Sequence, residues 1–401
     1  MCLGAGLVGW IALSPLGSPA WIMFLALAWG NARTRGAAFC VGFSYSFALA
    51  FTLPQAMMNF APSLSPFAAA LALPTMAAIS GLAFAACWAP SSRGEAYRIA
   101  SALTLLLVLA VPPLGAVFWG HPILATAELF PGMGVAGIAA AILLWAALAS
   151  LRLRGMDTEA STASAATSDE LVASIIGLAL VSSVVHLQAD LMTDDTKPLA
   201  STGSSVVVGV DFAMGRMPID QVNQYAYLSL EVAPTLRAMH LPAGSIALLP
   251  ESVGGVTSSA RLQWWHHELA DFFAEQGTLI LGEWDLHGKG IGVISGQRYR
   301  YYPARQSTPW TEWQWSNDYP SFGMFSNVVE LGDGKRYALI NCYEAAIAWP
   351  IFLDLLRQPD AILFASNQFW ARDNRGGEAI DASITAWGRI AGVPVVRAIN
   401  R

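Results

Sequence analysis

The amino-acid sequence predicts a membrane α-helical bundle of about seven spans over residues 1–190, followed by an α/β layered domain over residues 191–401. Composition is the first reason, because 55% of the 401 residues are hydrophobic and only 12% are charged, whereas soluble domains carry roughly 25% charged residues. The uneven division of charge is the second reason, since only six of the 22 Lys and Arg residues precede residue 189. The first half therefore has the composition of a membrane region and the second that of a soluble domain.

Long apolar runs make up the first half, and an α-helix needs about 20 such residues to cross a bilayer. The predicted spans are 2–13, 17–31, 36–54, 67–89, 98–119, 131–151 and 170–188. The first run is short and is followed by Pro15 and Pro19, so the first two helices are expected to form a tight hairpin. A signal peptide is the alternative for residues 1–20, but this segment lacks a basic amino-terminal region.

The basic residues of the first half predict its orientation. They lie in alternate loops, at Arg33, Arg35, Arg93, Arg98, Arg152 and Arg154, while the loops near 54–66 and 120–131 have none. Basic loops stay on the cytoplasmic side, so the chain after residue 188 is expected in the periplasm of a bacterial cell, beyond the inner membrane. The polar segment 155–169 is expected to be a flexible cytoplasmic loop.

In the second half, short β-branched runs alternate with amphipathic segments, which favours an α/β layered domain. The predicted strands are 205–211, 245–250, 278–284, 290–296, 324–331, 335–342, 361–366 and 393–399. The predicted helices are 219–239, 259–276, 345–358 and 378–391.

Three polar residues stand at predicted strand ends, where such folds carry their chemistry. They are Glu251, Cys342 and Asn367. Taken singly, a Glu after a strand is usually a solvated turn residue and a Cys is usually core filler. Taken together, they indicate a cleft in which a carboxylate takes the thiol proton while Cys342 attacks a carbonyl carbon to form a thioester.

Four short motifs in order carry a resemblance: LLPES around Glu251, NCYE at 341–344, ASNQFW at 365–370 and VVRAIN at 395–400. They resemble the nitrilase (carbon–nitrogen hydrolase) superfamily, and their position after an apolar bundle resembles apolipoprotein N-acyltransferase and, more closely, a conjugal-transfer relative of it. The resemblance implies an αββα sandwich. It also implies that Glu251 is the general base, that Cys342 is the nucleophile, and that the backbone N–H of Tyr343 helps to bind an oxyanion. Glu312 and Glu344 match two supporting glutamates.

The family lysine is where the chain departs from this pattern. Counting back from Pro309 puts it at Ala304, and the neighbouring Arg305 is the candidate replacement. Lys289 and Lys335 stand in glycine-containing segments and are expected to be solvated. The chain also stops at Arg401, inside the last motif, so we expect the nitrilase-like domain to be truncated at its C-terminal end.

The segment after Pro309 is dense in tryptophan, at Trp310, Trp313 and Trp315, and such residues favour a membrane interface. They are candidates for a lipid-facing lid, and a plain anchor or packed surface loop is the alternative. No metal is expected, because His266 and His267 lack a third ligand at a suitable spacing, and no cofactor is expected. A sequence pI of about 5.5 without a basic run excludes a nucleic-acid partner.

Three functions stay open at this point. The first is a membrane acyltransferase that takes an acyl group from a phospholipid and passes it to an amine. The second is a carbon–nitrogen hydrolase, in which water replaces the amine. The third, suggested by the missing lysine and the short end, is a catalytically impaired scaffold that contacts proteins of a plasmid-conjugation apparatus.

Overall fold

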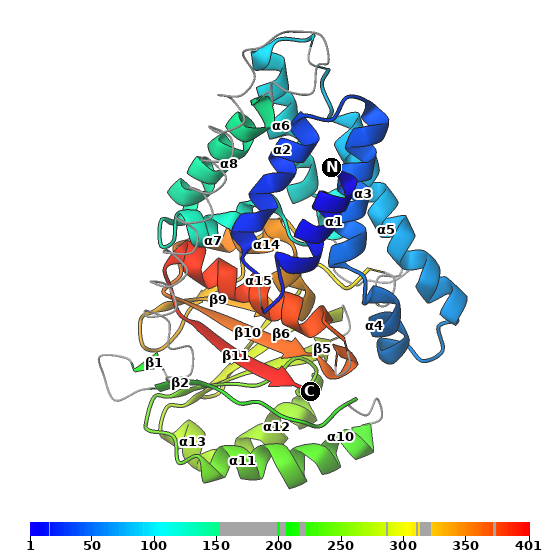
Figure 1. Cartoon of the computed structure of the whole chain (residues 1–401). Helices are drawn as coiled ribbons and strands as arrows, with labels where there is room; N and C mark the ends of the chain where they lie inside the picture. Colours follow the sequence, from blue (N-terminus) through cyan, green and yellow to red (C-terminus); the bar gives the residue numbers. More distant parts are fainter. Residues whose placement is uncertain are drawn as a thin grey trace. The chain divides into compact units, whose positions relative to one another are not determined.

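The computed structural model describes residues 1–15, 17–90, 92–151, 199–200, 206–216, 221–285, 288–309, 312, 322–371 and 374–401 (Figure 1). The chain divides into two compact units. The helical unit comprises Met1–Phe51, Ala70–Asp194 and Thr385–Gly392. The α/β unit comprises Thr52–Ala69, Asp195–Ile384 and Val393–Arg401.

The helical unit is built from α1 (Cys2–Ile11), α2 (Phe24–Gly30), α3 (Arg35–Leu49), most of α5 (Pro66–Ala86), α6 (Glu95–Ala110), α7 (Thr126–Leu129) and α8 (Gly134–Ser150), with short 3₁₀ turns at Pro19–Met23, Leu114–Ala116 and Pro122–Ala125. Each predicted span up to residue 151 overlaps one of these helices. The seventh, 170–188, lies outside the described residues. The fifth is shorter than predicted, because Pro112 and Pro113 follow α6 closely and proline cannot continue a helix.

Helix length decides how much of the predicted bundle is confirmed. Within the described part of the chain, only α5 is by itself long and apolar enough to cross a bilayer. Two further pairs of helices, each with a bend between its members, are long and apolar enough only when both members count as one span. They are α3 with α4 (Leu53–Phe60), and Pro122–Leu129 with α8. The number of seven spans is therefore not confirmed and stays a prediction.

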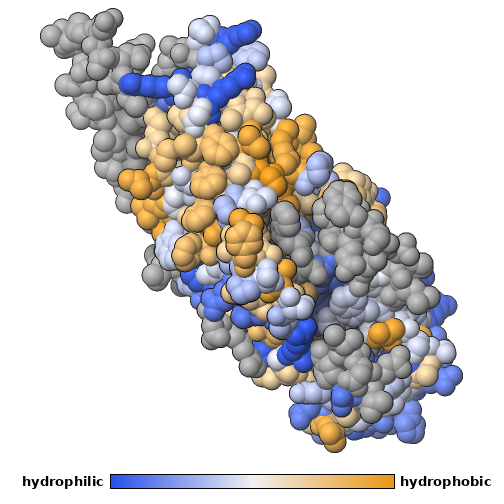
Figure 2. Space-filling view, turned by 90° about the vertical axis from the view of Figure 1, so that its right-hand side faces the viewer, coloured by the Kyte–Doolittle hydropathy of each residue, from blue (hydrophilic) through white to orange (hydrophobic). Residues whose placement is uncertain are grey.

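The surface of the helical unit is rich in apolar side chains, as Figure 2 shows. Leu3, Leu82, Leu107 and Leu143 are each more than half exposed. A large exposed apolar surface indicates contact with lipid or with another apolar surface.

Arg98 was predicted to lie in a cytoplasmic loop, but unlike the exposed Arg33, Arg35 and Arg93 it is buried in the helical unit. Its guanidinium donates hydrogen bonds to the carbonyls of Gly30, Ala149 and Ser150, at 2.8–2.9 Å. These carbonyls lie at the C-terminal ends of α2 and α8, where the last carbonyl groups have no hydrogen-bond donor within the helix. Arg98 thus joins two helix ends.

The α/β unit contains two sheets. Sheet A has the order β1 (Leu199–Ala200), β2 (Val206–Gly209), β3 (Ile246–Leu248), β5 (Thr278–Asp285), β6 (Gly288–Ser295) and β7 (Arg298–Pro303), with β4 (Gly255–Val256) paired to β5. Sheet B has the order β11 (Val395–Asn400), β10 (Ala361–Asn367), β9 (Arg336–Asn341) and β8 (Val328–Glu330). Strands β9, β10 and β11 are parallel, so their carboxyl ends share one edge.

The two sheets pack face to face. One core joins Ile246, Ile280 and Ile291 of sheet A to Leu339 and Leu363 of sheet B. A second core lies on the other face of sheet A, beneath α10 (Gln221–Tyr227), a π-helical turn (Leu228–Val232), α11 (Ala233–Ala238), α12 (Ser259–Glu268) and α13 (Ala270–Ala274). Helices α14 (Ala348–Leu355) and α15 (Gly376–Ala391) follow β9 and β10 (Figure 1). The predicted α/β layers are confirmed.

Several elements differ from the prediction, and the two-residue strands β1 and β4 are among those not predicted. Strand β7 was not predicted, because its sequence RYRYYP is polar on one face and ends in proline. The segment 54–66 was expected to be a loop between spans, but Leu53–Phe60 forms helix α4, which belongs to the α/β unit. Pro54 near its start and the buried residues Leu53, Ala56 and Met57 account for this helix.

Candidate active site

Cys342 follows β9 directly and begins a short 3₁₀ turn, η5 (Cys342–Ala346). Its backbone φ is 29°, in a region that non-glycine residues rarely adopt, and strained residues of this kind cluster at functional sites. The side chain is 5% exposed. The turn is fixed by Glu344, whose carboxylate accepts a hydrogen bond from the Asn341 N–H at 3.1 Å.

Glu251 lies in the turn after β3 and is 4% exposed. Its backbone packs so closely on β5 that a Cβ at Gly282 would lie 2.3 Å from the Glu251 Cα. One carboxylate oxygen, Oε2, accepts a hydrogen bond from the Asn367 N–H at 3.2 Å. Strands β3, β9 and β10 therefore bring the three predicted strand-end residues together.

Lys289 on β6 is the cation of this site. Its Nζ donates to Glu251 Oε1 at 2.7 Å and to Glu312 Oε1 at 2.8 Å, and the side chain is 3% exposed. The expectation that Lys289 is solvated is therefore wrong. Lys289 alternates with Ile291 and Val293, which face the core between the sheets. This period-two pattern was the signal that could have placed it inside.

Glu312 is fixed by its own turn. Its second oxygen accepts a hydrogen bond from the Thr308 N–H at 2.8 Å, and its N–H donates to the Thr308 carbonyl at 3.0 Å. The tryptophans predicted to face lipid, Trp310, Trp313 and Trp315, lie outside the described residues.

The ionic groups set the protonation states of the site. Burial by itself lowers the pKa of Lys289, but Glu251 and Glu312 raise it, and the net pKa is above its ordinary value. Burial raises the pKa of the Cys342 thiol well above its ordinary value, and the charge of Glu251 adds to this. Lys289 and Ser366, whose hydroxyl donates to Cys342 Sγ at 3.4 Å, act in the opposite direction. The resting site therefore holds a protonated lysine and a neutral thiol.

Arg305 occupies a different cluster. It is completely buried and donates to both oxygens of Glu344 at 3.1 Å, to Asp354 at 2.8 Å and to the Pro350 carbonyl at 2.8 Å. Burial lowers the pKa of Arg305, but Glu344 and Asp354 raise it above its ordinary value, so it stays charged. Through Glu344, Arg305 stabilises the turn that carries Cys342. The cation that pairs with Glu251 is Lys289. The expectation that the site lacks a lysine is corrected accordingly.

Tyr343 is the second residue of η5 and is buried. The use of its N–H as an oxyanion donor stays a prediction. In the described ranges, His, Cys, Asp and Glu form no group of three or more that could hold a metal ion.

Two known proteins are similar to this chain along nearly all of it. The conjugal transfer protein TraB of Agrobacterium fabrum is 25% identical over 423 residues, which cover 100% of this chain and 91% of that protein. The chain resembles TraB over its whole length. The probable conjugal transfer protein TraB of Sinorhizobium fredii is 25% identical over 413 residues, with 98% and 95% coverage. No protein-family model matches the chain.

Similar solved structures include a mutant amidase of the nitrilase superfamily from Nesterenkonia. It is 15% identical, and the match covers 49% of this chain and 76% of the amidase, with a TM-score of 0.36. Another is a glutamine-dependent NAD+ synthetase from Acinetobacter baumannii, 16% identical, with 40% and 32% coverage and a TM-score of 0.23.

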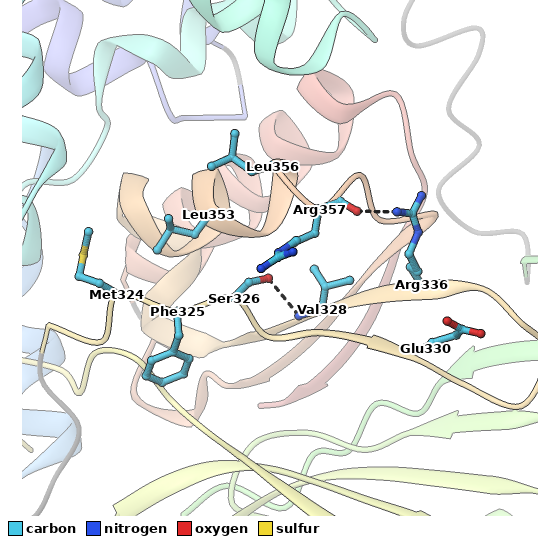
Figure 3. Close-up of a pocket in the computed structure, with 9 residues that line it drawn as sticks. All are labelled: Met324, Phe325, Ser326, Val328, Glu330, Arg336, Leu353, Leu356 and Arg357. Carbon is cyan, nitrogen blue, oxygen red and sulfur yellow. Dashed lines mark hydrogen bonds between the residues drawn. The ribbon is translucent and has the colours of Figure 1, made fainter.

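A cavity of about 860 Å³ lies between α14 and β8, where the Arg357 side chain extends (Figure 3). Its lining shares no residue with the Cys342 site: Met324, Phe325, Ser326, Val328, Glu330, Arg336, Leu353, Leu356 and Arg357. Ser326 connects the two regions, because its hydroxyl donates to Asp354 at 2.8 Å and Asp354 binds Arg305. The cavity therefore lies next to the Arg305 cluster and is separate from the Cys342 thiol.

Proposed function

We propose that this chain is an inner-membrane enzyme of the nitrilase type that transfers an acyl group, or hydrolyses an amide C–N bond, through a thioester on Cys342. The observation that carries the proposal is the bridge that Lys289 makes between Glu251 and Glu312 beside a buried thiol. Structural ion pairs also occur in protein cores, but a thiol and a carboxylate that lie together have the arrangement of a nucleophile with its activating group.

Glu251 is the general base. As the Cys342 Sγ bonds to the substrate carbonyl carbon, the S–H proton passes to the Glu251 carboxylate. When the C–N or C–O bond of the tetrahedral species breaks, Glu251 returns this proton to the leaving group. Water or an acceptor amine then attacks the thioester and gives a proton to Glu251, and the C–S bond breaks to restore the thiol.

Lys289 does not need to move a proton. An ammonium has three N–H donors, and the carboxylates of Glu251 and Glu312 take two of them. The third donor, with the Tyr343 N–H, is suited to the oxyanion of the tetrahedral species. Such preorganised donors contribute roughly 10²–10³-fold to rate.

The membrane setting is part of the proposal. The apolar amino-terminal half, the arginine loops and the exposed leucines support a multi-pass protein of about seven spans whose α/β unit is periplasmic. In that setting, membrane lipids are partners, a phospholipid is the candidate acyl donor, and Trp310, Trp313 and Trp315 contact the lipid. Similarity to TraB supports a role in plasmid conjugal transfer, with proteins of the conjugation apparatus as further partners.

The non-enzymatic scaffold remains the alternative. Its main support was the absence of the family lysine near Pro309, and Lys289 supplies a lysine beside Glu251.

Mass spectrometry of protein purified from membranes under mildly acidic conditions tests the proposal. We expect a hydroxylamine-sensitive acyl mass on the Cys342 peptide, absent in Glu251→Gln and never present on the Cys40 or Cys87 peptides. A bare Cys342 thiol, together with normal plasmid transfer by Cys342→Ala, would overturn the enzymatic proposal in favour of the scaffold.

A further inference from the structure

Helix α4 comes from the apolar amino-terminal half of the sequence, yet it contacts the turn that follows Asn367. The Asn59 side-chain amide donates a hydrogen bond to the Trp370 carbonyl at 2.8 Å. The next residue, Phe60, stacks on Phe369 with ring centroids 6.1 Å apart. Trp370 and Phe369 form the short 3₁₀ turn η6 (Phe369–Ala371), so two successive residues of α4 hold this turn.

The turn is in direct contact with the reacting groups. The Trp370 indole N–H donates to the Asn367 carbonyl at 2.8 Å. That carbonyl lies 4.0 Å from the Cys342 Sγ, and the N–H of the same residue donates to Glu251. The peptide groups of Asn367 therefore face both the nucleophile and the base, and Trp370 fixes their orientation.

We propose that α4 is a component of the candidate active site and that Asn59 is a positioning residue, which acts on Cys342 and Glu251 through Trp370 and Asn367. The inference rests on the proposed function for its chemical meaning, but its structural content does not depend on turnover. It predicts that residues 199–401 alone form an incomplete site, because the segment that holds the 367–371 turn lies far earlier in the chain.

The chain offers close comparisons for a test. Asn374 donates to the same Trp370 carbonyl, also at 2.8 Å, from within the loop itself. Gln55 is an exposed amide one helical turn before Asn59 on α4, so it is a matched control. Asn59→Asp keeps the size of the side chain but removes the N–H donor, and Asn59→Gln keeps the donor.

Two measurements on the detergent-purified full chain decide the inference. Hydrogen exchange of the amides of residues 367–371 should become about tenfold faster in Asn59→Asp, with Asn59→Gln intermediate and Gln55→Ala unchanged. The pH profile of iodoacetamide alkylation at Cys342 should shift in Asn59→Asp, because the Asn367 N–H no longer holds Glu251 in place. A merely structural role would lower the melting temperature without moving this profile.

The outcomes separate the two proposals. If wild-type Cys342 carries no acyl group but Asn59→Asp shifts both exchange and alkylation, the proposed function fails and the positioning role stands. If both measurements match the wild type in Asn59→Asp, the positioning role is overturned, whatever the acyl adduct shows. An Asn374→Ala variant that reproduces the whole effect, with Asn59→Asp silent, would likewise assign the role to the loop alone.

Discussion

Two buried clusters of the α/β unit each combine one cation with two carboxylates, and they differ in what lies beside the cation. In the Arg305 cluster, the guanidinium uses its Nε and both terminal nitrogens on Glu344, Asp354 and a carbonyl. In the Lys289 cluster, two carboxylates take two of three donors, and a thiol lies beside them. The Arg305 cluster joins the Cys342 turn to α14 and supports the fold, whereas the Lys289 cluster lies against a thiol and has the capacity for chemistry.

The largest effect expected from this difference is on stability. Arg305→Met should cost about 3–5 kcal/mol, because it leaves Glu344 and Asp354 buried without their cation. The measurement is the thermal midpoint of the purified chain. Arg336→Met is the matched control, since its ion pair with Asp360 is 3.9 Å long and nearly half exposed, and such pairs contribute roughly 0–1 kcal/mol. Equal midpoints for the two variants would contradict the structural assignment.

The next effect is on rate. Lys289→Arg keeps the charge but replaces a compact ammonium with a planar fork, so the oxyanion donor is misplaced. The rate of acyl-adduct formation at Cys342 should fall about 10²-fold. Quenched time points analysed by mass spectrometry measure this rate. If Lys289→Arg acylates at the wild-type rate while Arg305→Lys does not, the roles of the two clusters are the reverse of those assigned here.

The smallest effects are opposite shifts of the Cys342 alkylation profile with pH. Glu251→Gln removes a charge that raises the pKa of Cys342, so iodoacetamide alkylation should begin at lower pH. Ser366→Ala removes a hydrogen bond that lowers this pKa, so alkylation should begin at higher pH. Shifts in the same direction would show that access to the thiol, and not its ionisation, limits alkylation.

The raised pKa of Cys342 also makes the stability of the folded protein depend on pH. The folded state holds the Cys342 proton beyond the ordinary pKa of 9.0, so the thiol's contribution to stability is complete below that pH. It is lost as pH rises toward the folded-state value. Wild-type protein should therefore lose more stability than Cys342→Ala above about pH 9.

The sequence predicted the parts of the site that stand at strand ends. Glu251, Cys342 and Asn367 could be found in this way because a change from apolar to polar residues marks where a strand stops. Lys289 was missed because Gly288 and Gly290 flank it and glycine-rich segments usually indicate turns, although its alternation with Ile291 and Val293 marks a buried face. In the structure these glycines belong to a strand, and Gly290 and Gly292 lie where a Cβ would meet Tyr302 and Glu283.

The N-terminal half shows a different limit. Apolar runs located its helices, but run length overestimated α6, which Pro112 and Pro113 follow closely. Hydropathy also could not show that α4 leaves the helical unit, since that depends on contacts with residues such as Trp370, more than 300 positions later in the chain. Arg98 was counted as a loop charge although three helix-end carbonyls bind it.

Gly282 has a consequence for the divergence of such chains. Any side chain there would collide with the backbone of residue 251, so a substitution at Gly282 displaces the turn that carries the base. A homologue with a larger residue at this position is expected to have its base moved away from the thiol, even with Cys342 still in place.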